Sequence, residues 1–128
     1  MTLQVEVVSP ERILYSGEAE MVVCRTPAGE IAFMTGHIPF LGALGIGAVR
    51  IHQEGGDVQK VAVHEGFVEV SNDHVTLLSD VAELPDQIDQ ERARRAKEDA
   101  EQRAKDSDDE EAEARRRRAE IRLELAGG

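Results

Sequence analysis

The sequence is poor in the residues that mark secreted and metal-binding proteins. Cys24 is its single cysteine, so no disulfide can form within the chain. A tetrahedral zinc site would have to be built from scattered histidines, because Cys24 supplies only one thiolate. A reducing, cytosolic setting fits this cysteine usage best.

Positive charge is also scarce. Asp and Glu number 26 against 15 Lys and Arg, and the formal net charge is -11 at pH 7. A chain with this charge repels the phosphates of nucleic acids, which proteins normally bind through Lys and Arg. We therefore expect no nucleic acid partner.

Long apolar runs are missing as well. The most apolar window, 38–49, is shorter than the ~20 residues of a membrane-spanning helix, and Pro39 and three glycines interrupt it. The segment Met1–Val5 lacks the basic start and continuous apolar stretch of a signal peptide. We expect no direct membrane insertion and no export by that route, so any membrane association would come through partners.

The chain has two halves with different periodicities. Up to residue 85, apolar residues recur at spacing two in short runs, as at Leu3, Val5 and Val7, which is typical of half-buried strands. Turn residues separate the runs roughly every ten residues. The pattern predicts an antiparallel β-sandwich over residues 1–85.

The clearest hairpin of this half joins a strand at 67–70 to a strand at 75–78. Asn72 and Asp73 lie between them, and both residue types tolerate the positive φ of a type I′ turn. The register places the two valines of the first strand on one face. The hairpin is therefore well specified.

Catalytic and metal-binding motifs are not found. The four histidines, at 37, 52, 64 and 74, do not have His-x-His or His-x-x-x-His spacing. The glycine-rich run 42–47 lacks the Lys-Ser/Thr of a phosphate loop and is interpreted as a strand-edge loop, and Cys24 is interpreted as a buried hydrophobe. We predict no catalytic residue and no metal site. A metal-dependent β-barrel enzyme remains an alternative, motivated by the histidines alone.

After Pro85 the composition changes abruptly. Gly, Pro, Val and aromatic residues are absent until the last two positions, and Ala, Glu, Arg and Asp dominate. Asp86 is the predicted N-cap of a first helix, and Ser107 with Glu110 the predicted capping box of a second. The pattern predicts an antiparallel two-helix hairpin over residues 86–128, and hence an α+β chain.

The hairpin should be weakly packed, because its apolar positions are few and mostly small. They are Ala93, Ala96, Ala100 and Ala104 on the first helix, and Ala112, Ala119, Ile121, Leu123, Leu125 and Ala126 on the second. At ~25 cal/mol per Å², so little buried area cannot hold the hairpin firmly against chain entropy. We expect it to be able to move. A solvated helical tail that serves only solubility is the alternative interpretation.

Seven short segments carry more specific information. They are Val5–Glu11, Ser16–Ala19, Gly29–Pro39, Gly47–Ile51, Gly66–Val70, Val75–Glu83 and Ile88–Ala93. In order and spacing they resemble the ATP synthase epsilon family, and the resemblance covers roughly the first 95 residues. The chain departs from the family pattern at Ala32 and Thr35, where Gly and Pro are usual.

The resemblance implies a sandwich of about ten strands in a non-catalytic central-stalk subunit of the proton-translocating F-type ATP synthase. Such a subunit packs on the gamma subunit and the c-ring, and it lies at the cytoplasmic face of the cell membrane as a peripheral part of the complex. Glu30 and His37 match positions near the rotor interface, one suited to a basic c-ring loop and the other to a gamma surface. Both could equally be ordinary turn residues.

The resemblance also implies a switch. The family's hairpin either folds beside the sandwich or extends along gamma to the alpha and beta subunits, where it blocks ATP hydrolysis. The basic run formed by Arg115, Arg116, Arg117 and Arg118 would then meet acidic surfaces of the catalytic head. Alternatively, these arginines balance acidic neighbours three and four residues away.

Some family members bind ATP at the folded hairpin through a motif that Ile88, Asp89, Arg92 and Ala93 match. Ile88 would pack the base, Asp89 would accept from its amino group, and Arg92 would attract phosphate. Asp89 and Arg92 also have the i, i+3 spacing of a helix salt bridge. ATP is thus a candidate regulatory ligand, and no other cofactor is expected. A free-standing cytosolic ATP- or small-ligand-binding sandwich sensor is the alternative function.

Overall fold

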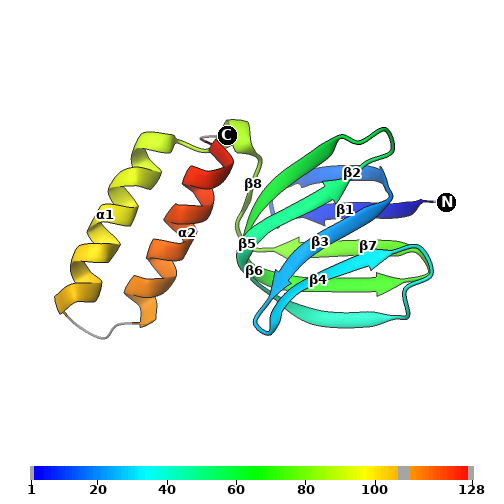
Figure 1. Cartoon of the computed structure of the whole chain (residues 1–128), viewed down its shortest axis with the longest axis horizontal. Helices are drawn as coiled ribbons and strands as arrows, with labels where there is room; N and C mark the ends of the chain where they lie inside the picture. The colour runs from blue at the N-terminus through cyan, green and yellow to red at the C-terminus, as the bar shows by residue number, and fades with distance from the viewer. Residues whose placement is uncertain (1, 107–109, 127–128) are drawn as a thin grey trace.

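The computed structural model describes residues 2–106 and 110–126. It has eight strands: β1 (Leu3–Val8), β2 (Ile13–Ala19), β3 (Met21–Thr26), β4 (Gly29–Met34), β5 (Phe40–His52), β6 (Val58–Ser71), β7 (His74–Ser79) and β8 (Ala82–Glu83). A short 3-10 helix, η1 (Pro85–Gln87), and two α-helices follow, α1 (Gln90–Asp106) and α2 (Glu110–Ala126). The strands form a sandwich and the helices form a hairpin at one side of it (Figure 1). The predicted α+β class is confirmed.

The strands form one continuous hydrogen-bonded path, in the order β2-β1-β7-β6-β5-β3-β4, with β8 paired to β6. The long strands β5 and β6 serve both layers, since their first and second halves pair with different neighbours. Counting each of these two strands once per layer gives the expected ten. The pair β1–β7 is parallel, whereas the sequence predicted antiparallel pairing throughout. Alternation of apolar residues is the same in both arrangements, so it could not distinguish them.

The two layers meet where β5 and β6 bend, at Gly45 and Glu65, a position that the ladder between them skips. Glu65 has φ 70° and Gly66 has φ 147°. A Cβ on Gly66 would lie 1.9 Å from the Leu78 carbonyl oxygen, so only glycine fits there. The Ser79 hydroxyl donates a 2.6 Å hydrogen bond to the Glu65 carbonyl oxygen, which stabilises the bend.

The core fills the space between the layers and is made of alternate strand residues. Phe33 is its largest fully buried side chain. Cys24 is 1% exposed, as predicted, and burial followed by the nearby Glu30 charge raises its thiol pKa to about 11. This thiol is a packing residue and a poor nucleophile.

The interpretation of residues 42–47 as a loop was wrong, because they lie inside β5. Their glycines make room for neighbouring side chains. A Cβ on Gly42 would lie 2.7 Å from the Phe40 ring, and one on Gly47 would lie 3.1 Å from Cβ of Arg25. Gly42 and Gly47 therefore serve close packing, and the chain continues as a strand through the bend at Gly45.

The predicted hairpin between β6 and β7 is confirmed. Asn72 and Asp73 have φ 50° and 59°, the two left-handed values of a type I′ turn. Val68 and Val70 are both buried on the inner face, as the register requires.

The first helix begins later than predicted. Asp86 lies in η1, and α1 is capped by Asp89, whose Oδ1 accepts a 3.0 Å hydrogen bond from the Arg92 backbone N–H. The 3-10 turn Pro85–Gln87 and the extended residue Ile88 that follows it move the cap three residues along. The predicted capping box around Ser107 lies outside the described residues.

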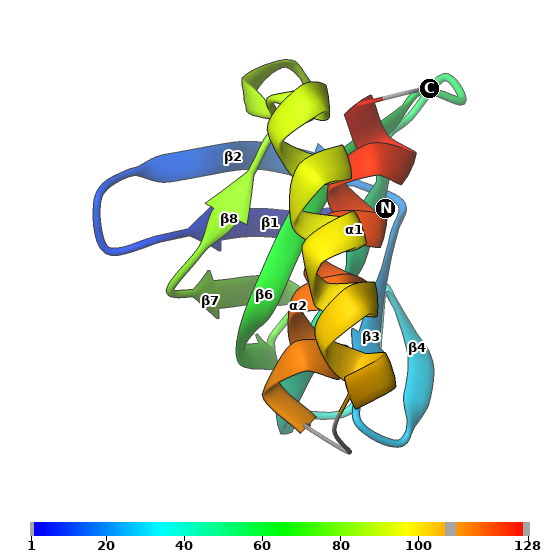
Figure 2. The same ribbon diagram turned by 90° about the vertical axis from the view of Figure 1, so that its left-hand side faces the viewer.

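The two helices run antiparallel, with α2 between α1 and the strands β5 and β6 (Figures 1 and 2). Buried side chains along the hairpin are small except for one: Ala93, Ala100, Ala119 and Leu125. Ala96, predicted for the same stripe, is exposed. No helix within the described ranges is long and apolar enough to cross a membrane.

Candidate functional site

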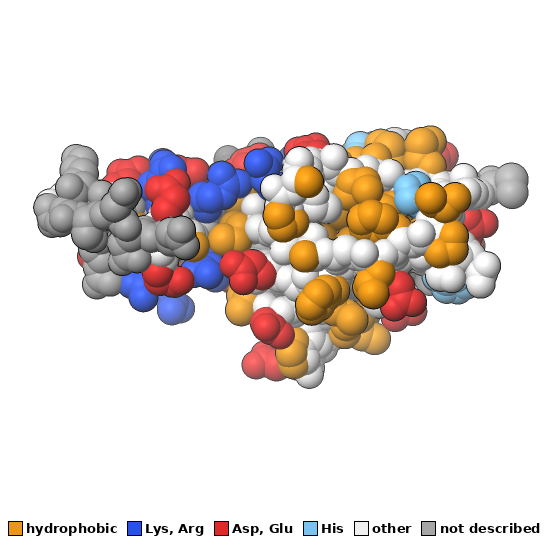
Figure 3. Space-filling view, turned by 90° about the horizontal axis from the view of Figure 1, so that it is seen from below, with side chains coloured by type: hydrophobic (Ala, Val, Ile, Leu, Met, Phe, Trp, Pro, Cys, Tyr) orange, Lys and Arg blue, Asp and Glu red, His pale blue; other side chains and the backbone are white. Residues whose placement is uncertain are grey.

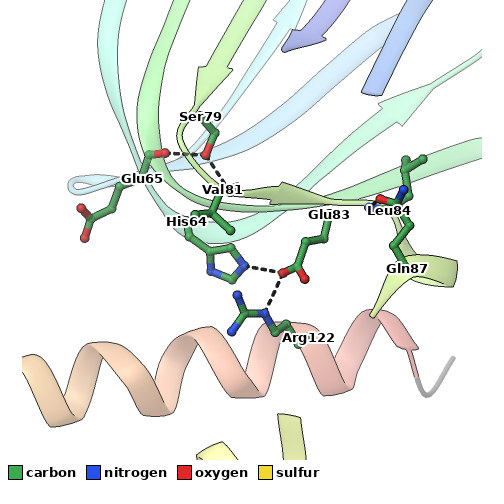
Figure 4. Close-up of polar contacts among 8 residues, drawn as sticks. All are labelled: His64, Glu65, Ser79, Val81, Glu83, Leu84, Gln87 and Arg122. Carbon is green, nitrogen blue, oxygen red and sulfur yellow. Dashed lines mark hydrogen bonds and ion pairs between the residues drawn. The ribbon is translucent and has the colours of Figure 1, made fainter. Parts of the chain in front are cut away.

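A polar cluster joins the sandwich to the hairpin (Figure 4). His64 of β6 lies with Nε2 3.1 Å from Oε1 of Glu83 in β8, and Nε of Arg122 in α2 donates to the same oxygen at 2.6 Å. His64 and Glu83 belong to the sandwich, and Arg122 belongs to the hairpin. The Glu83 carboxylate is therefore one of the groups that attach α2 to the sandwich.

His64 is neutral at ordinary pH. Burial, followed by the charge of Arg122, lowers its pKa to about 4, while the hydrogen bond to Glu83 acts in the opposite direction. The neutral ring then donates its Nε2 proton to Glu83. Its buried Nδ1 has no hydrogen-bond partner among the described residues.

Beside this cluster lies a hollow of about 400 Å³ between α1, α2 and the sandwich. Its walls include Arg115, Arg118 and Arg122 of α2, together with His64, Val81, Ala96 and Asp99. Guanidinium groups bind anions such as phosphate, but each of these three already has an acidic partner, so an anionic ligand would have to compete with Glu83 and Glu111. Arg122 lies outside the basic run, so its contribution could not be predicted from the sequence pattern.

The four arginines of the basic run point in different directions around α2. Arg115 and Arg118 reach the hollow and approach Oε1 of Glu111 at 3.5 and 3.3 Å. Arg116 pairs with Glu113 and, at 2.9 Å, with Glu120. Acidic neighbours three and four residues away thus balance part of the run, as the alternative interpretation predicted.

Arg117 faces a different region from the other three arginines. It lines a second hollow of about 600 Å³ at the bend of the sandwich, together with Arg25, Glu65 and Asp80. Contact of the four arginines with a catalytic head remains a prediction.

The predicted nucleotide motif lies at the start of the hairpin, where one of its residues, Asp89, has a structural role. The Asp89 carboxylate caps α1, as described above, and Arg92 is exposed on that helix. Ile88 is half-buried. Within the described chain, the walls of the three-arginine hollow do not include these residues.

Glu30 and His37, predicted for the rotor interface, stand at opposite ends of β4. The Glu30 carboxylate lies 2.9 Å from Nη2 of Arg50, so its charge already has a partner within the chain. His37 follows β4 in a loop, where its ring meets Phe33 edge-on at 4.9 Å. The structure does not bring the two residues together.

An exposed apolar row crosses the outer face of the sandwich. In register across β2, β1, β7, β6 and β5 stand Ile13, Val8, Leu78, Phe67 and Ala43. We call these five residues the apolar row. Ile13, Leu78 and Phe67 are 61%, 48% and 60% exposed. Side chains directly opposite on one face of a sheet touch, so the row is continuous.

The apolar row was missed at the sequence level although a signal existed. Phe67 and Leu78 alternate with the buried Val68 and Leu77 and therefore point outward. The predicted strands already implied this. Figure 3 shows the general contrast, with hydrophobic side chains gathered over the sandwich and charged ones over the helices. Contiguous exposed apolar surface of this kind marks an interaction site.

Metal binding finds no support in the described residues, where no three His, Cys, Asp or Glu side chains are grouped to hold an ion. The polar cluster around Glu83 links the hairpin to the sandwich, and the apolar row is exposed on the outer face.

Comparison with known proteins identifies the family of the chain. The family model of the ATP synthase delta/epsilon chain β-sandwich domain matches residues 2–85. The chain is 47% identical over 127 residues to the ATP synthase epsilon chain of Shouchella clausii, covering 98% of this chain and 95% of that one. It is 52% identical over 101 residues to that of Brevibacillus brevis, covering 79% and 76%.

A chain in the solved Euglena gracilis mitochondrial ATP synthase assembly of OSCP, F1 and c-ring has the same fold. The TM-score is 0.75 at 24% identity, covering 98% of this chain and 78% of that one. Together, the family model and the relatives show that this chain belongs to the ATP synthase epsilon chain family, whose members are stalk subunits and not catalytic ones.

Proposed function

We propose that the protein is a central-stalk subunit of a proton-translocating F-type ATP synthase, held at the cytoplasmic face of the cell membrane by its partners, and that it couples c-ring rotation to ATP synthesis. The apolar row carries this proposal. It offers an exposed apolar surface across five strands, of the kind that a protein partner covers. The gamma subunit is the partner we assign to it.

The polar surroundings of the apolar row fit such an interface. One register step away stand Glu6, Thr76 and Glu69, in line across β1, β7 and β6. Leu41, 73% exposed, completes that line on β5. An apolar centre with an acidic rim favours a partner whose own rim is basic.

The test is binding of purified variants to the organism's own ATP synthase from which this subunit has been stripped. Phe67→Ser removes the largest side chain of the apolar row and should weaken binding about thirtyfold, the effect of an aromatic anchor. Val58→Ser is the matched control, because Val58 is exposed on β6 in its other half. Equal affinities for the two variants would refute the assignment of this surface.

Glu30 and His37 are proposed as further rotor contacts. Glu30 would have to exchange its bond with Arg50 for a basic group of the c-ring loop. Glu30→Gln should then reduce binding to the stripped enzyme in low salt and have less effect in high salt. An unchanged affinity at both salt concentrations would remove Glu30 from the interface.

We also propose that the hairpin, residues 86–128, restrains ATP hydrolysis when it extends toward the alpha and beta subunits. Its folded position depends on polar contacts of α2 with Glu83 and Glu65 and on alanine packing, so few large apolar groups oppose its release. Arg115–Arg118 would exchange their acidic neighbours for acidic surfaces of the head. Assembled enzyme with and without residues 86–128 should differ in hydrolysis rate, and equal rates would defeat the proposal.

ATP binding to the folded hairpin is a second candidate function. The arginines of the hollow support an anionic ligand, and the motif residues would have to reach that ligand from outside the walls of the hollow. In this proposal Arg92 and Arg115 attract phosphates, Ile88 packs the base, and Asp89 accepts from the amino group while keeping its cap. Titration calorimetry with ATP on wild type, Arg92→Ala and Arg115→Ala tests it. Absence of heat with the wild type would end it.

A free-standing sensor is the competing assignment. It would bind a ligand without joining a larger complex, so co-purification separates the two. The stalk subunit should co-purify with gamma from membranes, and a sensor should not.

A further inference from the structure

The loop between β4 and β5 is built on a tight turn. The His37 backbone N–H donates to the Met34 carbonyl oxygen at 3.1 Å, and Gly36 has φ 86°, which is the pattern of a type II turn. The second position of such a turn favours proline, whose ring fixes φ. Thr35 occupies it here and leaves φ free. The turn therefore needs another restraint to keep one conformation.

Asp73 supplies that restraint from a distant part of the chain. Its Oδ1 accepts a 2.8 Å hydrogen bond from the Gly36 backbone N–H. Its own carbonyl oxygen accepts a 2.8 Å bond from the Gln4 backbone N–H. One residue thus joins the β6–β7 turn, the start of β1 and the β4–β5 loop.

The loop that Asp73 fixes carries the most exposed large apolar side chain described. Ile38 is 75% exposed, and Met34 beside it is 57% exposed. The loop lies at the end of the sandwich away from the helices (Figure 1). Leu41, which follows it on β5, stands in the line next to the apolar row, so the loop continues the surface assigned above to a partner.

We propose that Asp73 is a positioning residue for partner binding, whose carboxylate holds the loop 35–39 so that Ile38 is presented in its bound conformation. The inference rests on the proposed function, with the gamma subunit as the partner that receives Ile38. A loop fixed before association loses less conformational freedom on binding, so its restraint adds affinity without adding a contact. Ile38 makes the contact, and Asp73 acts through it.

The test compares two substitutions at the same residue. Asp73→Asn keeps an acceptor oxygen and tolerates positive φ, whereas Asp73→Gly tolerates positive φ and removes the acceptor. Binding to the stripped ATP synthase should weaken about five- to tenfold for Asp73→Gly and less than about twofold for Asp73→Asn. Asn72→Gly is the matched control, since it places the same flexible residue one position earlier in the turn. Hydrogen exchange at the Gly36 amide of the free subunit should accelerate only in Asp73→Gly.

A double-mutant cycle separates positioning from general stability. Ile38→Ala should weaken binding about tenfold in the wild-type background and only about twofold in Asp73→Gly, because an unfixed loop has already lost most of the Ile38 contribution. Additive effects, or equal affinities of Asp73→Gly and Asn72→Gly, would overturn the proposal. A wild type that fails to bind the stripped enzyme would instead refute the proposed function itself.

Discussion

Acid should destabilise the sandwich through His64. The ordinary pKa of histidine is about 6.5, whereas burial and the neighbouring Arg122 lower that of His64 to about 4. The unfolded chain therefore binds a proton at a pH where the folded chain does not. Stability from this residue is present above the unfolded value and decreases as pH falls from about 6.5 toward 4.

The size of the effect follows from the shift. Each pKa unit corresponds to about 1.4 kcal/mol, so going from pH 7 to pH 5 should remove about 2 kcal/mol of unfolding free energy through His64. The cationic groups facing the ring, Arg122 and Arg118, oppose its protonation, and Glu83 favours it. Carboxylates elsewhere add their own pH dependence, so wild type must be compared with a variant.

The assay is urea unfolding of wild type and His64→Gln at pH 7 and pH 5. Glutamine can still donate to Glu83 but does not titrate, so the variant should lose about 2 kcal/mol less than the wild type over this range. His74→Gln, at an exposed histidine that begins β7, serves as the control for the substitution itself. Equal pH dependence in wild type and His64→Gln would refute the assignment of a neutral buried ring.

Three further predictions concern individual positions. Gly66→Ala should lower the free energy of unfolding by more than about 3 kcal/mol or prevent folding, because the new Cβ would lie 1.9 Å from a carbonyl oxygen. Gly29→Ala, which has φ 130° but open space around the new Cβ, is the control and should lower stability less. Thermal unfolding measures both. Asp89→Ala should lower stability by about 1 kcal/mol in urea unfolding, and Asp86→Ala should not, since only Asp89 caps α1. Glu83→Gln should increase hydrogen exchange of α2 amides severalfold. The neutral amide replaces the carboxylate that accepts the 2.6 Å hydrogen bond from Arg122, and the bond to a neutral group is weaker.

The sequence predicted most of the fold because strand alternation and turn chemistry are local signals. The Asn72-Asp73 turn and the buried Val68 and Val70 follow from a few consecutive residues. The parallel pairing of β1 with β7 depends on residues about seventy positions apart, and no local pattern encodes it. Residues 42–47 were misinterpreted for a related reason. Glycine is needed there because side chains of other residues, such as Arg25, pack against the backbone.

The candidate site was predicted less well, because its members come from different elements. His64, Glu83 and Arg122 belong to β6, β8 and α2, and each is unremarkable in its own segment. The motif at 88–93 was visible in the sequence, but the cap made by Asp89 depends on where the helix begins. The residue at which a helix begins is harder to predict than the helix itself.

The contrast between the two parts of the molecule bears directly on the proposed movement of the hairpin. Sixteen buried hydrophobic residues form the core cluster, and all of them belong to the sandwich. The hairpin contacts the sandwich through half-exposed ion pairs of Arg118 and Arg122, together with small side chains. Separating such a contact returns charged groups to water and exposes little large apolar surface, so its free-energy cost is small and depends on salt. Covering the apolar row, in contrast, removes apolar surface from water and lowers the free energy. Proteins with this distribution of surfaces can keep the sandwich bound to one partner while the hairpin changes position.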